Sequence, residues 1–274
     1  MTRAAGLPTV TLPWSLAHPI SDIYKTYGDN VDVVSKAKSL LKFGKSVMAA
    51  STPRMIWELS ADDETYVTTN AIDTISSSSA TDTGIALRIE GHTVSGTGTS
   101  AVFTFSVQTV TVLGQAKVLL GTPLARVSRM NVVGVSGLAG DVYVYEDDTL
   151  TGGVPNTAAK QHIVIKGTNG DTQSYKAATT ISNQDYFIMS RFMGSVNRQQ
   201  TATVDFEVQV RTAGGVYRPI QHITANSGGL TTAWDQFDPY IIIPRNADVR
   251  ILGESSATAN VNASFQGYLA SIIS

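Results

Sequence analysis

The sequence predicts an all-β fold, namely an antiparallel β sandwich, jelly-roll-like, that follows an extended N-terminal arm with room for one short helix. Three observations lead to this prediction. First, apolar and polar residues alternate in many segments after residue 55. Second, turns rich in glycine, proline and asparagine separate these segments. Third, no long helical pattern lies between them. Strand after strand without intervening helices is typical of sandwiches, jelly rolls and barrels.

The start of the chain differs from the rest, so the expected organisation is an arm over residues 1–60 and a β-sandwich region over residues 61–274. Prolines at positions 8, 13 and 19 argue against a place inside a sheet, because proline cannot donate a ladder hydrogen bond. Val34, Ala37 and Leu41 have helical spacing and Gly44 is placed as a stop, which favours a short helix, although the β-branched Val33 weakens it.

The β-sandwich region is expected to consist of short strands. In residues 204–210, Val204, Phe206, Val208 and Val210 alternate with polar residues and fall on one face of an extended chain. The predicted strands cover residues 55–59, 72–76, 85–90, 102–113, 117–120, 126–133, 141–146, 162–166, 174–181, 186–196, 204–211, 216–223, 240–243, 249–253 and 261–272.

Turn signals divide these strands. Glycine-rich turns at residues 96–98, 169–171 and 213–215 predict hairpins. The loop at residues 147–160 is the best candidate for a division into two β subdomains, and it could equally be one long jelly-roll loop.

Composition narrows the function classes. With 274 residues and 42% hydrophobic content the chain can bury a substantial core, but only 15% is charged, against roughly 25% in typical soluble domains, which favours a surface for protein contact. A net charge of −2 argues against nucleic acid and anionic membrane as partners. The absence of cysteine excludes disulfides, thiolate nucleophiles and cysteine-bound zinc. No apolar run reaches the roughly 18 residues of a membrane span, and no signal core opens the chain, so we expect a cytosolically made protein that is neither secreted nor inserted in a membrane.

The motifs predict no enzyme, no cofactor and no metal site. The Gly44-Lys45-Ser46 triplet lacks the first glycine of a phosphate-binding loop, and a strand pattern follows the Gly96-Thr97-Gly98 turn where a dinucleotide site needs a helix. The four histidines have no metal-ligand spacing. The acidic clusters at residues 62–64 and 146–148 are expected to be solvated loop acids, with calcium binding or glycosidase chemistry left open.

The arm is the most basic part of the chain, so it is the predicted partner-binding region. Its cations could dock on an acidic partner surface, or they could form one solvated helix face. The predicted partner-binding residues are Trp14, Lys36, Lys38, Lys42, Lys45 and Arg54.

One series of segments remains, at residues 72–83, 89–91, 108–115, 125–127, 140–144, 240–244 and 248–251. In this order the segments, which span about residues 55–274, resemble β-rich structural proteins of tailed bacteriophages, especially those of marine and freshwater hosts. The resemblance implies a virion component, most readily a capsid decoration or cement protein on the capsid surface that binds and stabilises the shell of the major capsid protein. It also implies a homo-oligomer, a trimer or a dimer, and carries over no catalytic residue.

Two alternatives stay open at this point. One is a tail or collar component that acts as a receptor or glycan-binding module, with aromatic residues stacking on sugars. The other is a polysaccharide-degrading enzyme that uses acids such as Asp147 and Asp148.

Overall fold

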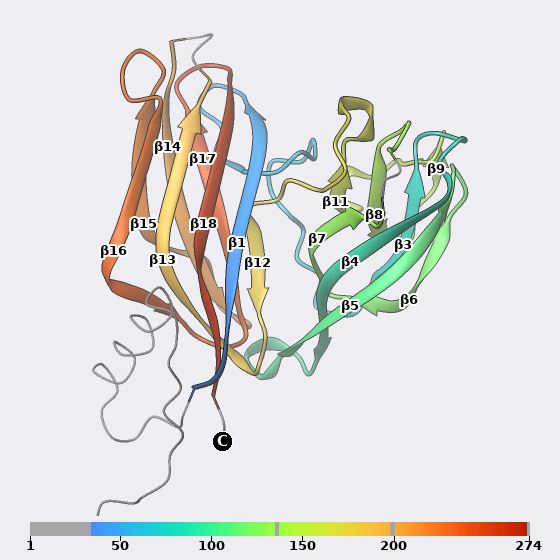
Figure 1. Ribbon diagram of the computed structural model, residues 1–274, viewed down its shortest axis with the longest axis horizontal. Coiled ribbons are helices and arrows are strands. Elements are labelled where there is room, and N and C mark those ends of the chain that lie inside the picture. Colours follow the sequence, from blue (N-terminus) through green and yellow to red (C-terminus); the bar gives the residue numbers. More distant parts are fainter. Residues whose placement is uncertain (1–33, 135–136, 198–200, 273–274) are drawn as a thin grey trace, which may run out of the picture.

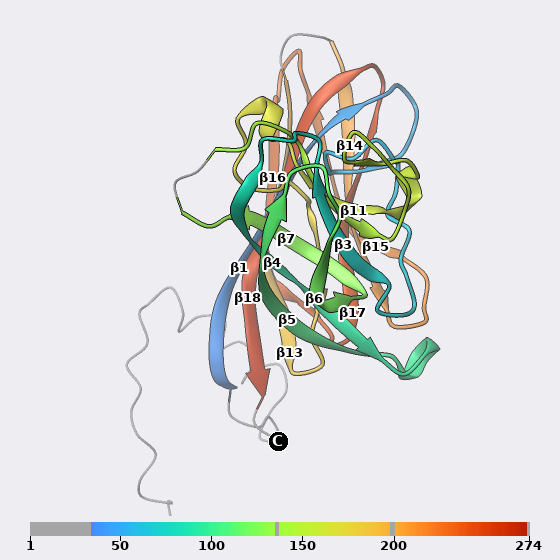
Figure 2. The ribbon, with the colours of Figure 1, turned by 90° about the vertical axis from the view of Figure 1, so that its right-hand side faces the viewer.

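The computed structural model describes residues 34–134, 137–197 and 201–272. These residues form two β sandwiches that lie side by side (Figure 1). The large sandwich is built from residues 34–55 and 178–272, and the small sandwich from residues 72–165. Figure 2, turned by 90°, shows the small sandwich in front of the large one. Their strands pair antiparallel, so the predicted all-β, antiparallel sandwich fold is confirmed.

The large sandwich has two sheets. Its strands are β1 (Val34–Met48), β2 (Arg54–Met55), β12 (Ala178–Ile181), β13 (Asp185–Val196), β14 (Thr203–Thr212), β15 (Arg218–Asn226), β16 (Thr232–Ile243), β17 (Ala247–Ser255) and β18 (Ala259–Ile272). One sheet has the order β1-β18-β13-β16 and the other the order β12-β17-β14-β15, with β2 also paired to β17. The chain passes repeatedly from one sheet to the other, which is consistent with the predicted jelly roll.

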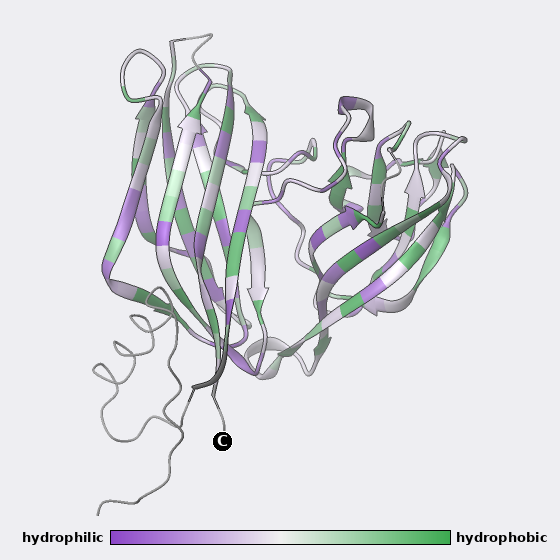
Figure 3. Cartoon of the chain, viewed as in Figure 1, coloured by the Kyte–Doolittle hydropathy of each residue, from purple (hydrophilic) through white to green (hydrophobic). Residues whose placement is uncertain are grey.

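Alternating side chains build the core of the large sandwich. Val204, Phe206 and Val208 of β14 are fully buried, as their spacing predicts, and they share one core cluster with Phe192 and Phe265 from the facing sheet. Figure 3 shows the alternation of apolar and polar residues along many strands. Because each strand has one apolar face, two sheets packed face to face bury both.

The small sandwich has a separate core. Its strands are β3 (Ile72–Ser77), β4 (Thr83–Ser95), β5 (Val102–Leu113), β6 (Val118–Leu124), β7 (Arg126–Val132), β8 (Val142–Glu146), β9 (Leu150–Thr151), β10 (Val154–Pro155) and β11 (Gln161–Ile165). The sheet β11-β8-β3-β6 faces the sheet β5-β4-β7, and Ile75, Leu87, Val112, Val144 and Ile165 are fully buried between them.

The arm predicted for residues 1–60 differs from the structure in its second half, and residues 1–33 lie outside the described part of the chain. Residues 34–48 form strand β1 and no short helix, with pairing to β18 from Lys36 opposite Ser271 to Met48 opposite Ala259. The apolar residues at helical spacing did not decide the local structure, because pairing along nearly the whole of β18 outweighs weak local propensity.

Gly44 is no helix stop either. It lies in the middle of β1, where a Cβ atom would sit 2.2 Å from the carbonyl oxygen of Ile56 and 2.6 Å from the backbone nitrogen of Ala177. Glycine is therefore required here so that two other backbone segments can approach the edge strand.

The loop at residues 147–160 does not divide the β region. It holds the small β9–β10 hairpin, and the strands on either side of it, β8 and β11, pair within one sheet. The chain instead passes between the sandwiches in two crossing segments, residues 56–71 and 166–177, so the small sandwich is an insertion between β2 and β12. The turn at residues 169–171 is consequently no hairpin, whereas the turns at 96–98 and 213–215 join the paired strands β4 with β5 and β14 with β15, as predicted.

Candidate functional site at the junction of the two sandwiches

The small sandwich stands against one edge of the large one. Strands β1 and β12 end their sheets on that side, and Figure 1 shows both next to the small sandwich. A bare sheet edge exposes unpaired backbone groups to other chains, so covering it protects a β protein from aggregation. The small sandwich covers this edge, and several charged side chains are buried at the junction between the two sandwiches.

A first cluster of charges centres on Asp248 of β17. Its carboxylate accepts hydrogen bonds from Arg126 Nε of β7 at 3.1 Å, from Arg211 Nη2 of β14 at 2.6 Å and from Thr180 Oγ1 of β12 at 2.7 Å. The ring of Tyr66, in the first crossing segment, lies under both guanidinium groups, at 4.8 and 4.2 Å. One buried carboxylate thus ties the small sandwich to the large one.

A second cluster lies along the same junction. Lys176 Nζ donates to Glu64 Oε1 at 2.6 Å and to the carbonyl oxygens of Val127 and His162. The His162 ring nitrogens lie 3.3 Å from Glu64 Oε1 and 3.2 Å from Glu146 Oε1. Burial opposes the ionisation of Glu64, but the charge of Lys176 and the hydrogen bond to His162 outweigh it and lower its pKa to about 2. Glu64 is therefore a carboxylate that locks the two crossing segments together.

Lys42 is a third buried charge at the junction. It lies on β1 opposite Phe265, and its Nζ donates to the carbonyl oxygen of Ser128 in β7 at 2.6 Å. Burial, together with the neighbouring Arg129, lowers its pKa to about 7. The ammonium form is thus unfavourable in the folded protein.

This environment makes stability depend on pH. Because the unfolded chain holds the Lys42 proton up to about its usual pKa of 10.5, the free energy of unfolding should rise between pH 7 and 10.5, by roughly 3 to 5 kcal/mol from this residue. Denaturant unfolding at several pH values should show this rise in the natural protein and lose it in Lys42→Met. The exposed Lys38, on the same strand, gives the matched control Lys38→Met, which should keep it. Equal pH dependence in all three proteins would contradict the buried-ammonium interpretation.

The predicted partner-binding residues do not form one docking surface in the described part of the chain. Trp14 and the side chain of Lys36 lie outside it, and Lys38 is exposed. Lys42 is buried as described above. Lys45 pairs with Asp171 and Glu58, and Arg54 donates to the carbonyl oxygen of Leu59. Three of the six residues therefore make contacts within the chain, because β1, with Lys42 and Lys45, and β2, with Arg54, both lie next to the crossing segments.

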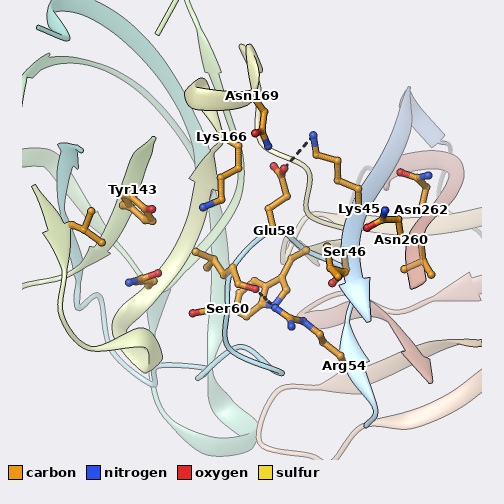
Figure 4. Close-up of a pocket in the computed structure, with 16 residues that line it drawn as sticks. Lys45, Ser46, Arg54, Glu58, Ser60, Tyr143, Lys166, Asn169, Asn260 and Asn262 are labelled. Atoms are coloured by element: carbon orange, nitrogen blue, oxygen red, sulfur yellow. Dashed lines mark hydrogen bonds and ion pairs between the residues drawn. The ribbon is translucent and has the colours of Figure 1, made fainter. Parts of the chain in front are cut away.

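A cleft of about 620 Å³ opens between the sandwiches beside β1 (Figure 4). Lys45 and Ser46 of β1, the crossing segment around Glu58, Lys166 after β11, and Asn262 of β18 are among its lining residues. Lys45 Nζ lies 2.7 Å from Asp171 Oδ2 and 3.1 Å from Glu58 Oε1, and burial raises the pKa of Glu58 to about 7. The cleft thus has a mixed polar and apolar lining, and an ion pair in it links strand β1 to both crossing segments.

The acidic loop residues considered for catalysis make ordinary surface contacts. Asp147 accepts from Lys117 Nζ at 2.6 Å, and Asp148 accepts from the backbone nitrogen of Thr157 at 2.6 Å. Within residues 34–134, 137–197 and 201–272, no group of three or more histidine or acidic side chains is arranged to hold a metal ion. In the same ranges no helix is long and apolar enough to cross a membrane.

Sequence reasoning missed the junction itself. The available signal was a charged residue in or beside a segment of apolar or small residues, as at Arg126, Lys176 and Asp248. The partners could not be read from spacing, since Glu64 and Lys176, or Arg126 and Asp248, are more than a hundred residues apart.

Comparison with known proteins identifies no relative. No protein-family model matches the chain, and no curated protein sequence matches it. Weak likenesses among solved structures include the infectious bursal disease virus Gt strain (9% identity, 89% of this chain and 74% of that one, TM-score 0.19) and the VP2 subviral particle of the same virus (8%, 90% and 75%, TM-score 0.20). Another is the insecticidal delta-endotoxin Cry8Ea1 of Bacillus thuringiensis (10%, 91% and 55%, TM-score 0.19). Likenesses at this level establish neither a shared fold nor a shared function.

Proposed function

We propose that this chain is a non-enzymatic virion structural protein, most readily a capsid decoration or cement protein that binds and stabilises the shell of a major capsid protein. The series of segments that resembles β-rich phage structural proteins supports this role. So does the build of the molecule, because the buried ion pair of Arg126 and Asp248 joins the two sandwiches and would be costly to break.

The observation that carries the proposal furthest is the outer face of the sheet β1-β18-β13-β16. Phe43, Ser264, Met193 and Trp234 stand opposite one another in register, so their side chains form one row across this face. Trp234 is 57% exposed, and the guanidinium of Arg191 lies over its ring at 4.9 Å. Tryptophan, methionine and arginine on a face otherwise rich in amides and hydroxyls are the composition of protein interfaces.

The N-terminal segment is the second part of the proposal. Lys42, Lys45 and Arg54 make contacts within the chain, so the proposed capsid-binding element is the rest of the predicted arm, residues 1–33. Removing residues 2–33 deletes no described strand. Several weak contacts in a dimer or trimer would add up to firm attachment.

Co-sedimentation with capsids assembled from the major capsid protein of the same virus tests this function. The variant lacking residues 2–33 should lose capsid binding while its unfolding temperature stays unchanged, and Trp234→Ala should weaken binding roughly ten-fold. Leu119→Ala, which removes an even more exposed apolar side chain from the small sandwich, is the control and should bind normally.

Each outcome decides part of the proposal. Unchanged binding after the deletion would reject the N-terminal segment as the capsid-binding element. Failure of the natural protein to bind capsids, or its location only at the collar or tail in images of the particle, would reject the decoration role.

A further inference from the structure

The cleft between the sandwiches contains buried polar atoms that have no partner. Ser46 Oγ, Arg54 Nε and Glu58 Oε2 are all shielded from solvent by the protein, and none makes a hydrogen bond within the described chain. All three residues line the same cleft, where Figure 4 shows the Glu58 carboxyl group pointing toward Lys45 and Asn169. Buried polar atoms are nearly always hydrogen-bonded, so three such atoms among the residues of one cleft mark it as a place where a polar ligand can bind.

The charges around the cleft are already compensated. Lys45 is paired with Asp171 and Glu58, Lys166 Nζ lies 2.9 Å from Asp141 Oδ2, and Arg54 Nη1 lies 3.9 Å from Asp62 Oδ1. Each charged side chain that lines the cleft therefore already has a partner of opposite charge. This arrangement disfavours a phosphate, a sulfate or a metal ion, each of which needs an uncompensated counter-charge.

The remaining groups suit a ligand rich in hydroxyls. The side-chain amides of Asn169, Asn260 and Asn262 line the cleft and make no hydrogen bond within residues 34–134, 137–197 and 201–272. Each amide offers both donors and an acceptor, as Ser46 Oγ does, whereas Glu58 Oε2 supplies an acceptor and Arg54 Nε a donor. A hydroxyl group both donates and accepts, so it can match all of these groups.

Apolar side chains complete the lining. Val47, Val154 and Val261 contribute hydrocarbon surface, and Val47 is 59% exposed at the rim. A ring that carries hydroxyls at its edge and C–H groups on its faces would contact both kinds of surface. The aromatic rings of Trp57 and Tyr143 are themselves buried, so binding by ring stacking is not expected here.

We propose that this cleft binds a neutral, polyhydroxylated ligand, of which a neutral sugar residue of a glycan is the chemical class that fits. The site is formed only when both sandwiches are in place, because β1 and β18 supply one wall and β8, β10 and β11 with the crossing segments supply the other. It does not depend on the capsid-binding proposal, since a decoration protein and a tail module could each carry it.

Binding of the full-length protein to a glycan array with neutral, sialylated and sulfated members tests the site, followed by titration of the best neutral glycan. We expect binding to neutral glycans that falls at least about ten-fold in Glu58→Gln and in Asn262→Ala. Asn156→Ala, an exposed asparagine outside the cleft, is the matched control and should bind normally.

The unfolding temperature of each variant should also be measured, so that a loss of binding can be told apart from a loss of folding. Asn262 is exposed, and its replacement should leave the fold intact. The proposal would be overturned if the protein bound no neutral glycan at millimolar concentration. A preference for sialylated or sulfated glycans, or binding that survives both cleft variants, would overturn it as well.

Discussion

Replacing Asp248 with alanine is expected to lower the free energy of unfolding by about 3–5 kcal/mol, the cost of removing one member of a buried charge cluster. Asp248 is 2% exposed and compensates both Arg126 and Arg211. Its loss leaves two guanidinium groups at the junction without a counter-charge. Denaturant unfolding measures the change.

The same variant should also loosen the two sandwiches from each other. Because Arg126 belongs to the small sandwich and Asp248 to the large one, limited proteolysis should cut the crossing segment at residues 56–71 faster than in the natural protein. Asp205→Ala, which removes an exposed carboxylate from β14, is the control and should change stability by less than about 1 kcal/mol. A similarly small effect of Asp248→Ala would show that the cluster does not hold the junction.

Replacing Glu64 alone with leucine should cost a comparable 3–5 kcal/mol, because the ammonium of Lys176 would then stay buried without its carboxylate partner 2.6 Å away. The double variant Glu64→Leu with Lys176→Met should recover much of that loss, since neither new side chain needs a counter-charge. The carbonyl oxygens of Val127 and His162 would lose a donor, so recovery should be incomplete.

The pH dependence of this pair has a definite sign. The pKa of Glu64 is lowered from its usual 4.5 to about 2, so its contribution to stability is complete above about pH 4.5 and is lost as the pH falls toward 2. Unfolding measured between pH 6 and 2 should show this loss in the natural protein and a smaller one in the double variant. If the double variant is no more stable than Glu64→Leu, the cost of the single replacement does not come from the unpaired ammonium.

The fold class and most strands were predictable from local patterns. The alternation in residues 204–210, for example, predicts an inward face, and Val204, Phe206 and Val208 are fully buried. Period-two hydrophobicity is enough here, because a half-buried strand must place its apolar residues on one side whatever its neighbours are.

Strand β1 was not predictable in the same way. Its lysines and its apolar residues at helical spacing suggested a basic helix on a free arm, yet the segment is an edge strand paired with β18, whose residues come more than two hundred positions later. Lys42 and Lys45 therefore serve the junction, where the sequence-based interpretation placed them on a partner-binding surface.

The sequence by itself determined that this protein is all-β, which faces of many strands are apolar, and that neither disulfides nor cysteine-bound zinc hold it together. Those properties depend on residue type and on spacing over a few positions. Only the tertiary structure decided that residues 72–165 form a second sandwich inserted between β2 and β12, that buried charges join the two, and that a polar cleft opens beside them. Each of these features depends on pairs of residues far apart in the chain, and such pairs leave no local pattern because their energy arises only after the intervening loop is closed.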